Sequence, residues 1–518
     1  MPTDPVTRRE LLRRSLLAGG ALPFGALVAA CARTERETGP TTSARSTQST
    51  ITAPSASTMT PTTMTSPPTT AAFDSRRPWW MQGGFAPVER ETYASPLEVT
   101  GSIPPELSGT YVRNGSNPSV GTSPHWFFGD GMVHGVRIGG GRAKWYRNRY
   151  VRTTMYESGA AFGEGPPGGA TNQSNVSAIW HAGRLLTSGE VGSPYELDPR
   201  DLSTRGVHDF DGRLPSAFTA HPKVDPVTDR MHSFGSGFTP PFLTYHITDP
   251  DGSLVHHEVV DIPRSTMMHD FAITDRDVVF WDLPVTFDLE AALDFIEDPR
   301  RGRFPYAWTP DAGARIGVMP LGGGADRIRW FDLDPCFVFH GVNAFRRGND
   351  VVVDVCRLTS MFAPGELLGG EASLRRWTID LSAGAVDESV LTDDDPGDLP
   401  TRDPRRVGRD YRFGYLLGSR QNPDTVDLGG LIKHDFRSGE RQRWDPGPTS
   451  HANEWIFVPA GGDPDDDAGY LLTYVHDEAI DVSELVIVDA SDVLAGPVAR
   501  IKLPTRVPYG FHATWIPD

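Results

Sequence analysis

Short runs rich in Val, Leu, Ile and Tyr recur along the chain from residue 76 onward, and each follows a polar turn rich in Gly, Asp or Asn. Apolar runs of this length, bounded by such turns, predict β-strands joined by hairpins. The first three runs are spaced by about one blade of a β-propeller, and the longer later intervals leave room for inserted loops. The pattern favours an all-β propeller over a β-sandwich or a paired barrel, and only residues 288–297 predict a helix. The runs begin at residues 181, 225, 274, 347, 412, 466 and 483.

Residues 1–31 have the pattern of an export signal. A basic start precedes an apolar stretch that Gly and Pro interrupt, which is too short and too broken for a transmembrane helix. The segment TRRELLR (7–13) resembles the twin-arginine signal, whose route carries folded proteins. VAAC (28–31) resembles a lipobox, in which Cys31 would be lipidated and become the mature N-terminus; an incidental cysteine within the signal is the alternative.

Residues 32–75 are rich in Thr, Ser and Pro and nearly free of bulky apolar side chains. Such a tract cannot bury enough surface to offset its ordering entropy, so it predicts a disordered tether. We therefore expect residues 76–518 to form the folded domain. We expect the twin-arginine route to export it and the lipid anchor to hold it on the outer face of the cytoplasmic membrane.

Charge and cysteine content narrow the function classes. The chain carries 49 Lys and Arg against 67 Asp and Glu, a net charge of −18, which argues against a nucleic-acid partner. Cys336 and Cys356 fit no metal-binding spacing and lie in strand-like runs. Buried apolar side chains are therefore the favoured interpretation, with a disulfide after export as the alternative. The oligomeric state stays open.

Four of the fifteen histidines, His221, His269, His340 and His512, lie among apolar or aromatic neighbours near the ends of strand-like runs. Taken singly, such a histidine is more often a core residue than a ligand. Taken together, their wide spacing suits ligands delivered one per blade to a shared axis, and not a local finger-type zinc site. Neutral imidazole binds Zn, Cu, Fe and Ni, whereas Ca²⁺ and Mg²⁺ prefer oxygen. The other eleven are assigned to turns or polar contexts: His125, His134, His181, His208, His232, His246, His256, His257, His434, His451 and His476.

Several longer motifs are spread over nearly the whole span from residue 78 to the C-terminus. They include LSGTYVRNGSNP (107–118), HWFFGDGMVHGV (125–136), TAHPKVDP (219–226), MMHDFAIT (267–274), FHGVNAF (339–345) and VPYGFHATW (507–515). These motifs, in this order, resemble those of the carotenoid cleavage oxygenase family. The resemblance implies a seven-bladed β-propeller with a metal on its axis and a cap of loops and helices on one face.

The same resemblance implies one Fe²⁺ per chain, held by the family's four histidines, which correspond here to His221, His269, His340 and His512. Similar family enzymes use O₂ to cleave a C=C double bond of a polyene or a stilbene into two carbonyl products. The metal and the pocket carry this reaction without a protein acid or base. We therefore expect a non-haem iron dioxygenase of carotenoids or apocarotenoids, with no catalytic residue beyond the metal centre.

The family backs three of its histidines with carboxylates, which fix the tautomer and direction of each ring. The matching positions are Glu190, Asp398 and Glu454. Asp398 departs from the usual Glu, and because it is one methylene shorter we expect its hydrogen bond to pass through a water or a shifted loop. Val176 stands where the family often has Thr, near a vacant iron position, and it keeps the methyl group while losing the hydroxyl.

The resemblance also implies an aromatic tunnel that admits an apolar polyene from the membrane. The stilbene-cleaving branch grips a phenol hydroxyl with a Tyr/Lys pair, and its lysine follows the segment matching residues 145–153. Here TMYESG follows without a lysine, which favours carotenoids or apocarotenoids. An iron-dependent isomerohydrolase of the same fold and a non-catalytic, lipid-tethered propeller are the alternatives. The candidate lining residues are Trp126, Phe127, Phe128, Phe271, Phe339, Phe345 and Phe511.

Overall fold

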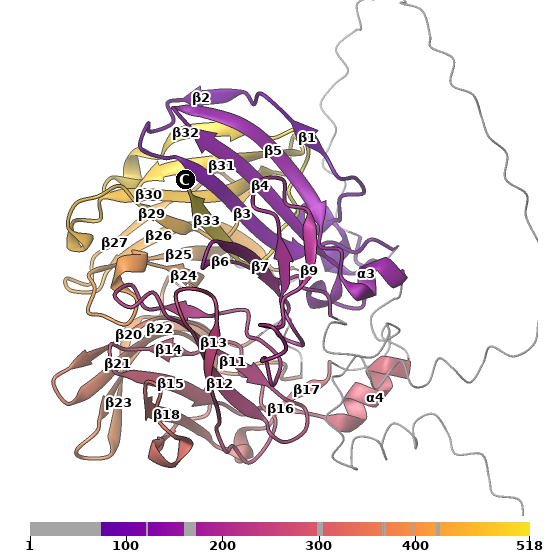
Figure 1. The fold of residues 1–518 in the computed structure, drawn as a ribbon. Helices are drawn as coiled ribbons and strands as arrows, with labels where there is room; N and C mark the ends of the chain where they lie inside the picture. Colours follow the sequence, from indigo (N-terminus) through magenta and orange to yellow (C-terminus); the bar gives the residue numbers. More distant parts are fainter. Residues whose placement is uncertain are drawn as a thin grey trace, which may run out of the picture.

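The computed structural model describes residues 74–518 except 121–122, 160–171, 298–303, 365, 367–368, 396 and 421–424. Within the described residues, seven sheets of four to six strands are arranged as blades around a central axis (Figure 1). The predicted seven-bladed β-propeller is confirmed. The predicted export signal, and all but the last two residues of the predicted tether, lie outside the described residues.

Six of the blades follow one another along the chain as antiparallel meanders. Blade 1 contains β6 (Ser177–His181), β7 (Arg184–Ser188), β8 (Tyr195–Leu197) and β9 (Thr204–Val207). Blade 2 contains β10 (Lys223–Val224), β11 (Met231–Ser236), β12 (Leu243–Thr248) and β13 (Leu254–Val259). Blade 3 contains β14 (Ala272–Ile273), β15 (Asp277–Asp282), β18 (Ala314–Pro320) and β19 (Arg329–Leu333), and the small hairpin β16 (Val285–Phe287) and β17 (Tyr306–Trp308) is inserted in it.

The next three blades repeat this design. Blade 4 contains β20 (Phe337–Arg347), β21 (Asp350–Leu358), β22 (Ala372–Asp380) and β23 (Ala385–Thr392). Blade 5 contains β24 (Gly397–Thr401), β25 (Phe413–Arg420), β26 (Asp427–Asp435) and β27 (Arg441–Trp444). Blade 6 contains β28 (Ser450–Ala452), β29 (Ile456–Pro459), β30 (Gly469–Asp477), β31 (Val482–Asp489) and β32 (Pro497–Lys502).

The ring closes by joining the two ends of the folded domain. Blade 7 takes its strands β1 (Tyr93–Ala94), β3 (Gly109–Ser116), β4 (Gly131–Gly139) and β5 (Arg142–Tyr150) from the N-terminal side. Its remaining strand, β33 (Ala513–Pro517), is the last of the chain and pairs with β3. A second N-terminal strand, β2 (Val99–Gly101), joins the outer edge of blade 6 beside β32. Both ends are thus hydrogen-bonded into the ring.

Glycine-containing turns set the hairpins that the sequence predicted. Ala182 and Gly183 join β6 to β7 with φ angles of 51° and 70°, and Gly140 and Gly141 join β4 to β5 with 63° and 67°. Positive φ at both central residues is the requirement of a type I′ turn, whose twist matches that of paired strands. These polar turns therefore form tight antiparallel hairpins.

Apolar side chains fill the space between every pair of neighbouring blades and form seven clusters there among the described residues. A smaller cluster of Val88, Met132 and Tyr150 lies beside them. Trp281 and Trp377, both fully buried, lie in the cluster between blades 3 and 4. Cys336 belongs to the same cluster, while Cys356 lies between blades 4 and 5. Both cysteines are free and buried, which agrees with the prediction that they are buried apolar side chains.

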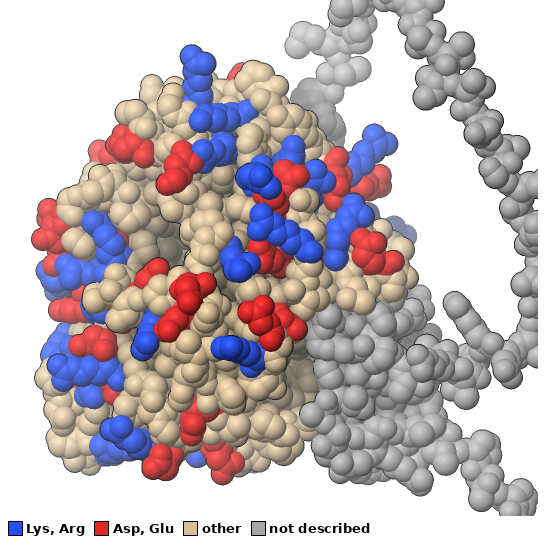
Figure 2. Space-filling view, viewed as in Figure 1, with Lys and Arg blue, Asp and Glu red and all other residues tan. Residues whose placement is uncertain are grey.

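Short helices cover one side of the ring. The predicted helix is present as α4 (Leu289–Glu297), and a second short helix, α3 (Thr154–Ser158), lies on the same side of the view in Figure 1. Phe295 of α4 packs against Phe128 of the 3₁₀ turn η4 (Trp126–Phe128), with ring centroids 5.2 Å apart. No helix in the described part of the chain is long and apolar enough to cross a membrane. Basic and acidic side chains are intermixed on the face shown in Figure 2.

Candidate metal centre

The four histidines singled out in the sequence come from four different blades and meet at the axis. His221 lies two residues before β10, His269 three residues before β14, and His512 directly before β33. His340 lies within β20. Each of these strands is the innermost strand of its blade, so the propeller brings together side chains that are far apart in the sequence.

The ring nitrogens of these histidines converge on one point. One nitrogen from each ring lies within 4.8 Å of the corresponding nitrogen of the other three. Nε2 of His269 is 2.9 Å from Nε2 of His221 and 3.3 Å from Nε2 of His340. The rings of His221 and His512 are 4.2 Å apart between centroids and nearly perpendicular.

Carboxylates from the other three blades contact Nδ1 of three of these rings, while the Nε2 atoms face the centre. Nδ1 of His340 is 2.8 Å from Asp398 of blade 5, and Nδ1 of His512 is 2.7 Å from Glu454 of blade 6. Nδ1 of His269 is 2.6 Å from Glu190, which follows β7 of blade 1. All three predicted carboxylates therefore lie beside a histidine of the cluster, and all seven blades contribute to the centre.

Burial lowers the pKa of two histidines of the cluster. Burial lowers the pKa of His221 well below the usual imidazole value, and the neighbouring histidines lower it further. Burial also lowers the pKa of His512, although Glu454 opposes this. In His340 burial acts in the same direction, but Asp398 outweighs it and raises the pKa above its usual value. Four adjacent imidazoles in this setting cannot all be in the positively charged imidazolium form.

The donor set fits a transition-metal ion. A neutral imidazole that donates Nδ1–H to a carboxylate presents Nε2 as an unprotonated lone pair. Several such lone pairs facing one another repel unless a cation lies between them. Two nitrogens bound at about 2.1 Å and at right angles to each other are about 3.0 Å apart, close to the observed Nε2 separations. The cluster fits a non-haem metal site, and its nitrogen donors disfavour Ca²⁺ and Mg²⁺.

The segment that carries His512 is fixed by hydrogen bonds to distant parts of the chain. The backbone N–H groups of residues 509–513 all donate to groups more than thirty residues away. Gly510 leaves no space for a side chain, because a Cβ there would lie 1.6 Å from Nη1 of the buried Arg113. The acceptors, in order, are the carbonyl of Gly84, Oδ1 of Asn453, the carbonyls of Asn114 and Val176, and Oε2 of Glu454.

Asp398 reaches His340 directly, so the expected bridging water is not needed. The backbone accommodates the shorter side chain. The pairing of β24 with β25 is irregular between Asp398 and Thr401, and Leu399 has a left-handed φ of 49°. Oδ1 of Asp398 also accepts the N–H of Leu399 at 2.8 Å. The local shift of the strand is what brings the carboxylate to the ring.

A buried ion pair beside the cluster was missed in the sequence. Nζ of Lys223 is 2.6 Å from Oδ1 of Asp270, and Asp270 also accepts the N–H of Gly341 at 2.9 Å. The pair links the strands that carry His221, His269 and His340. The sequence did contain a hint of this ion pair, because Lys223 and Asp270 lie next to His221 and His269 in their motifs. Spacing along the chain does not show, however, that the two side chains meet.

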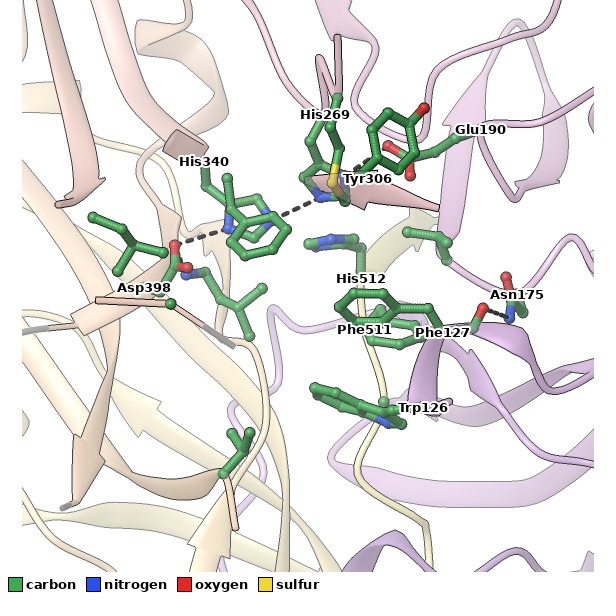
Figure 3. Close-up of a pocket in the computed structure, with 18 of the residues that line it drawn as sticks. Trp126, Phe127, Asn175, Glu190, His269, Tyr306, His340, Asp398, Phe511 and His512 are labelled. Atoms are coloured by element: carbon green, nitrogen blue, oxygen red, sulfur yellow. Dashed lines mark hydrogen bonds and ion pairs between the residues drawn. The ribbon is translucent and has the colours of Figure 1, made fainter. Parts of the chain in front are cut away.

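A cavity of about 470 Å³ opens against the cluster. His269, His340 and His512 line it together with two of the backing carboxylates, Glu190 and Asp398, and with Val176. His221 is not among the lining residues. Figure 3 shows Trp126, Phe127 and Phe511 grouped below the histidines, with their rings tilted against one another. The carbonyl of Val176 accepts the N–H of His512, which places this side chain next to the metal-binding face.

Five of the seven predicted aromatic residues line the cavity: Trp126, Phe127, Phe128, Phe339 and Phe511. The prediction was wrong for Phe271, which packs between blades 2 and 3, and for Phe345, which packs between blades 4 and 5. Both follow a histidine of the cluster in sequence, but Phe271 precedes β14 and Phe345 lies five residues beyond His340 in β20, and both side chains are buried between blades.

Sequence reasoning missed part of the lining. Phe304 and Tyr306 reach the cavity from the insertion in blade 3, and Phe238 reaches it from the end of β11. None of these positions lies in a motif that carries a ligand. Their only signal is an aromatic residue within a loop next to a strand, which also describes ordinary surface packing.

Several of the remaining histidines are buried on strands, and their assignment to turns or polar contexts was wrong. His134, His232 and His246 are almost fully buried. The first two hydrogen-bond to the hydroxyls of Tyr146 and Tyr245 within their own blades. They lie apart from the cluster of four, and each is a core histidine with a polar partner.

Comparison with known proteins places this site in a family. A family model described as "Retinal pigment epithelial membrane protein" matches residues 85–517. A carotenoid cleavage oxygenase of Mycobacterium tuberculosis is 36% identical over 503 residues, which cover 87% of this chain and 99% of that protein. The chain belongs to the carotenoid cleavage oxygenase family. The predicted resemblance is confirmed, and so is the prediction of an enzyme of this family.

Other members of the carotenoid cleavage oxygenase family that resemble this chain differ in substrate. An isoeugenol monooxygenase of Pseudomonas putida is 33% identical over 484 residues, covering 86% of this chain and 99% of that protein. The crystal structure of a lignostilbene dioxygenase of Pseudomonas brassicacearum superposes with a TM-score of 0.77 at 32% identity, covering 85% of this chain and 99% of that one. The family is therefore settled, and the substrate has to be argued from the cavity.

Proposed function

We propose that the chain is an Fe(II)-dependent dioxygenase that cleaves one C=C double bond of a carotenoid or apocarotenoid with O₂. Each carbon of that bond receives one oxygen atom, so that the products are two carbonyl compounds and no other reductant is consumed. The observation that carries the proposal is the four-histidine cluster, backed by three carboxylates, at the wall of an aromatic cavity. Iron, when bound, would supply the activation of O₂.

The residues of the chain hold this centre and shape its surroundings. His221, His269, His340 and His512 would bind the metal through Nε2, and Glu190, Asp398 and Glu454 hold three of the rings in that orientation. Neutral imidazole ligands do not cancel the charge of a dication, and the three carboxylates supply compensating negative charge one shell further out. No side chain of this set is required to transfer a proton.

The cavity supports an elongated, apolar substrate. Its wall beside the cluster is built of Trp126, Phe127, Phe339 and Phe511, and the ring of Phe339 meets the ring of His269 edge to face at 5.3 Å. Flat aromatic walls bind a conjugated chain through dispersion and exclude water from the reacting bond. Val176 presents its branched apolar side chain beside His512, where a substrate double bond would approach the metal.

A stilbene-type dioxygenase is the second candidate, because a lignostilbene dioxygenase is among the similar structures. The lysine that the stilbene branch uses is absent after residue 153, where TMYESG follows. This absence favours a carotenoid or apocarotenoid. An isomerohydrolase of the same fold would cleave an ester and take no oxygen atom from O₂.

Labelled oxygen tests the proposal. Purified iron-loaded protein is incubated under ¹⁸O₂ with a panel of carotenoids, apocarotenals and stilbenes, and the products are identified by mass spectrometry. The expected result is two carbonyl products from a polyene, each labelled before exchange with water. Unlabelled products, or cleavage of the stilbenes alone, would contradict the proposal.

A further inference from the structure

The cavity contains buried polar atoms that have no hydrogen-bond partner. Outside the histidine cluster, two of them belong to charged side chains, Arg420 of β25 and Asp427 of β26. The others belong to single neutral groups: Trp126 Nε1, Gln173 Nε2, Ser236 Oγ and Thr266 Oγ1. A buried donor or acceptor of a charged group is costlier to leave without a hydrogen bond than one of a neutral group, so Nη1 of Arg420 and Oδ1 of Asp427 are the stronger indication of a ligand.

The guanidinium of Arg420 is fixed on one side and free on the other. Nη2 donates to Oδ1 of Asp445 and to the carbonyl of Gly447, both at 2.8 Å. Nη1 is buried and has no acceptor. Because a guanidinium is planar and rigid, the two bonds to Nη2 also fix the direction of Nη1. Nη1 of Arg420 is therefore a hydrogen-bond donor with a fixed direction and no acceptor.

Asp427 offers an acceptor at the same place. It lies directly opposite Arg420 in the pairing of β25 with β26, where facing side chains are close enough to share a ligand. Oδ1 of Asp427 is 3.2 Å from Nδ1 of His451, but that nitrogen is hydrogen-bonded to the carbonyl of Leu428 at 2.9 Å. Oδ1 is left buried without a hydrogen bond. Arg420 forms its ion pair with Asp445 and not with Asp427.

This donor and acceptor lie away from the metal centre. Leu417 of β25 pairs with Asp398, which backs His340, and Arg420 is three residues further along the same strand. At the usual rise of a strand this is a distance of about 10 Å. Arg420 and Asp427 therefore contact a part of the substrate other than the bond that reacts.

We propose that Arg420 and Asp427 bind a hydroxyl group at one end of the substrate. Nη1 of Arg420 donates to the hydroxyl oxygen, and the hydroxyl donates to Oδ1 of Asp427. A hydroxyl is the terminal group that supplies both an acceptor and a donor. A carbonyl would leave Asp427 unpaired, a carboxylate would be repelled by Asp427, and a hydrocarbon end would leave both residues unpaired.

This inference rests on the proposed function, because it takes from it that the hydroxyl belongs to a conjugated substrate. Such a hydroxyl can come from the ring of a carotenoid or apocarotenoid, or from a phenol at the end of a stilbene. The two sources share the chemistry that Arg420 and Asp427 recognise, and they differ in the length and shape of the remaining molecule.

The test compares substrates that differ only in this hydroxyl. One pair is an apocarotenal with a ring hydroxyl and the same apocarotenal without it; the other is 4-hydroxystilbene and stilbene. We expect the hydroxylated member of the preferred pair to have a kcat/KM roughly tenfold to a hundredfold higher, mostly through KM, as for a hydrogen bond to a charged group. Equal kcat/KM values within both pairs would overturn the inference.

Variants assign the preference to these residues. Arg420→Met and Asp427→Leu should each abolish the preference for the hydroxylated member while iron content stays unchanged, and Arg420→Lys should keep part of it. Arg437→Met is the matched control, since Arg437 is half exposed and pairs with Asp465 outside the cavity. An Arg420→Met protein that folds and keeps the full preference would overturn the inference.

Binding is measured separately from cleavage, through quenching of tryptophan fluorescence by the same four compounds. If no compound is cleaved but the hydroxylated members bind roughly tenfold more tightly or better, the proposed function fails and the hydroxyl site stands. If compounds are cleaved and bound without regard to the hydroxyl, the function stands and the inference fails.

Discussion

His340 and His512 each have Nδ1 hydrogen-bonded to a carboxylate, which makes Nε2 an unprotonated donor, and Nδ1 of His269 lies 2.6 Å from Glu190. This arrangement explains why charge, and not only shape, requires a cation at the centre. The carboxylates act against burial on the pKa values: Asp398 outweighs burial at His340, Glu454 does not at His512, and His221 has no such carboxylate. At the scale of the residue, the carboxylates should therefore be tested by substitution, as the four histidines are.

Removing a backing carboxylate should weaken metal binding without removing a ligand. We expect Glu454→Ala and Asp398→Ala each to lower iron affinity by about 10–100-fold, the usual effect of losing the outer partner of a metal-bound histidine. Iron retention during dialysis against a graded chelator measures this effect. His257→Ala is the control, because His257 is exposed and outside the cluster. Normal iron retention in Glu454→Ala would show that this contact does not support the site.

The four histidines of the cluster could be predicted from the sequence because each interrupts an apolar run and lies in a motif of the family. The route by which Asp398 reaches His340 could not, since it depends on the left-handed backbone at Leu399 and not on side-chain type. The same limit applies to Phe271 and Phe345, whose burial between blades depends on the backbone path after each histidine and not on side-chain type.

At the scale of the element, the last strand has two roles. β33 completes blade 7 by pairing with β3, and the residues just before it carry His512. The strand pattern of the individual blades could be predicted from turns and apolar runs. The contribution of the blade 3 insertion to the cavity could not, because Phe304 and Tyr306 meet the lining only after the blades have packed.

Gly510 tests whether this element positions the fourth ligand. Gly510→Ala would force a Cβ into the space of Arg113, which is buried and donates to the carbonyl of Pro508 at 2.6 Å. We expect a loss of about 1–3 kcal/mol of stability, typical of overpacking, together with weaker iron retention. Thermal unfolding and metal analysis measure the two effects. A variant with unchanged melting temperature and unchanged iron would contradict this role of the segment.

At the scale of the whole molecule, the metal site exists only when the ring is nearly closed, because its ligands come from blades 2, 3, 4 and 7. Metal binding should therefore accompany folding. We propose that the protein folds and binds iron in the cytoplasm, passes through the twin-arginine route, and remains attached to the outer face of the membrane through Cys31. The residues that carry this proposal precede the described part of the chain.

Variants of the N-terminal segment test this order of events. We expect Arg8→Lys/Arg9→Lys to leave active, iron-loaded protein inside the cell, because the export machinery reads the arginine pair. Cys31→Ala should release active protein from the membrane in soluble form, since the lipid would be lost. Cell fractionation followed by iron and activity assays distinguishes these outcomes. Export of the double-lysine variant, or intracellular protein without iron, would argue against the proposal.

The central claim is that four histidines from four blades hold one catalytic iron. The most direct measurement is the metal content of purified protein by elemental analysis, repeated for alanine variants of His221, His269, His340 and His512. We predict about one iron per chain, and for each variant a protein that folds, has lost iron and has lost oxygen-dependent cleavage of a polyene. A wild-type protein without stoichiometric metal, or a His512→Ala protein with full iron and full turnover, would contradict the account.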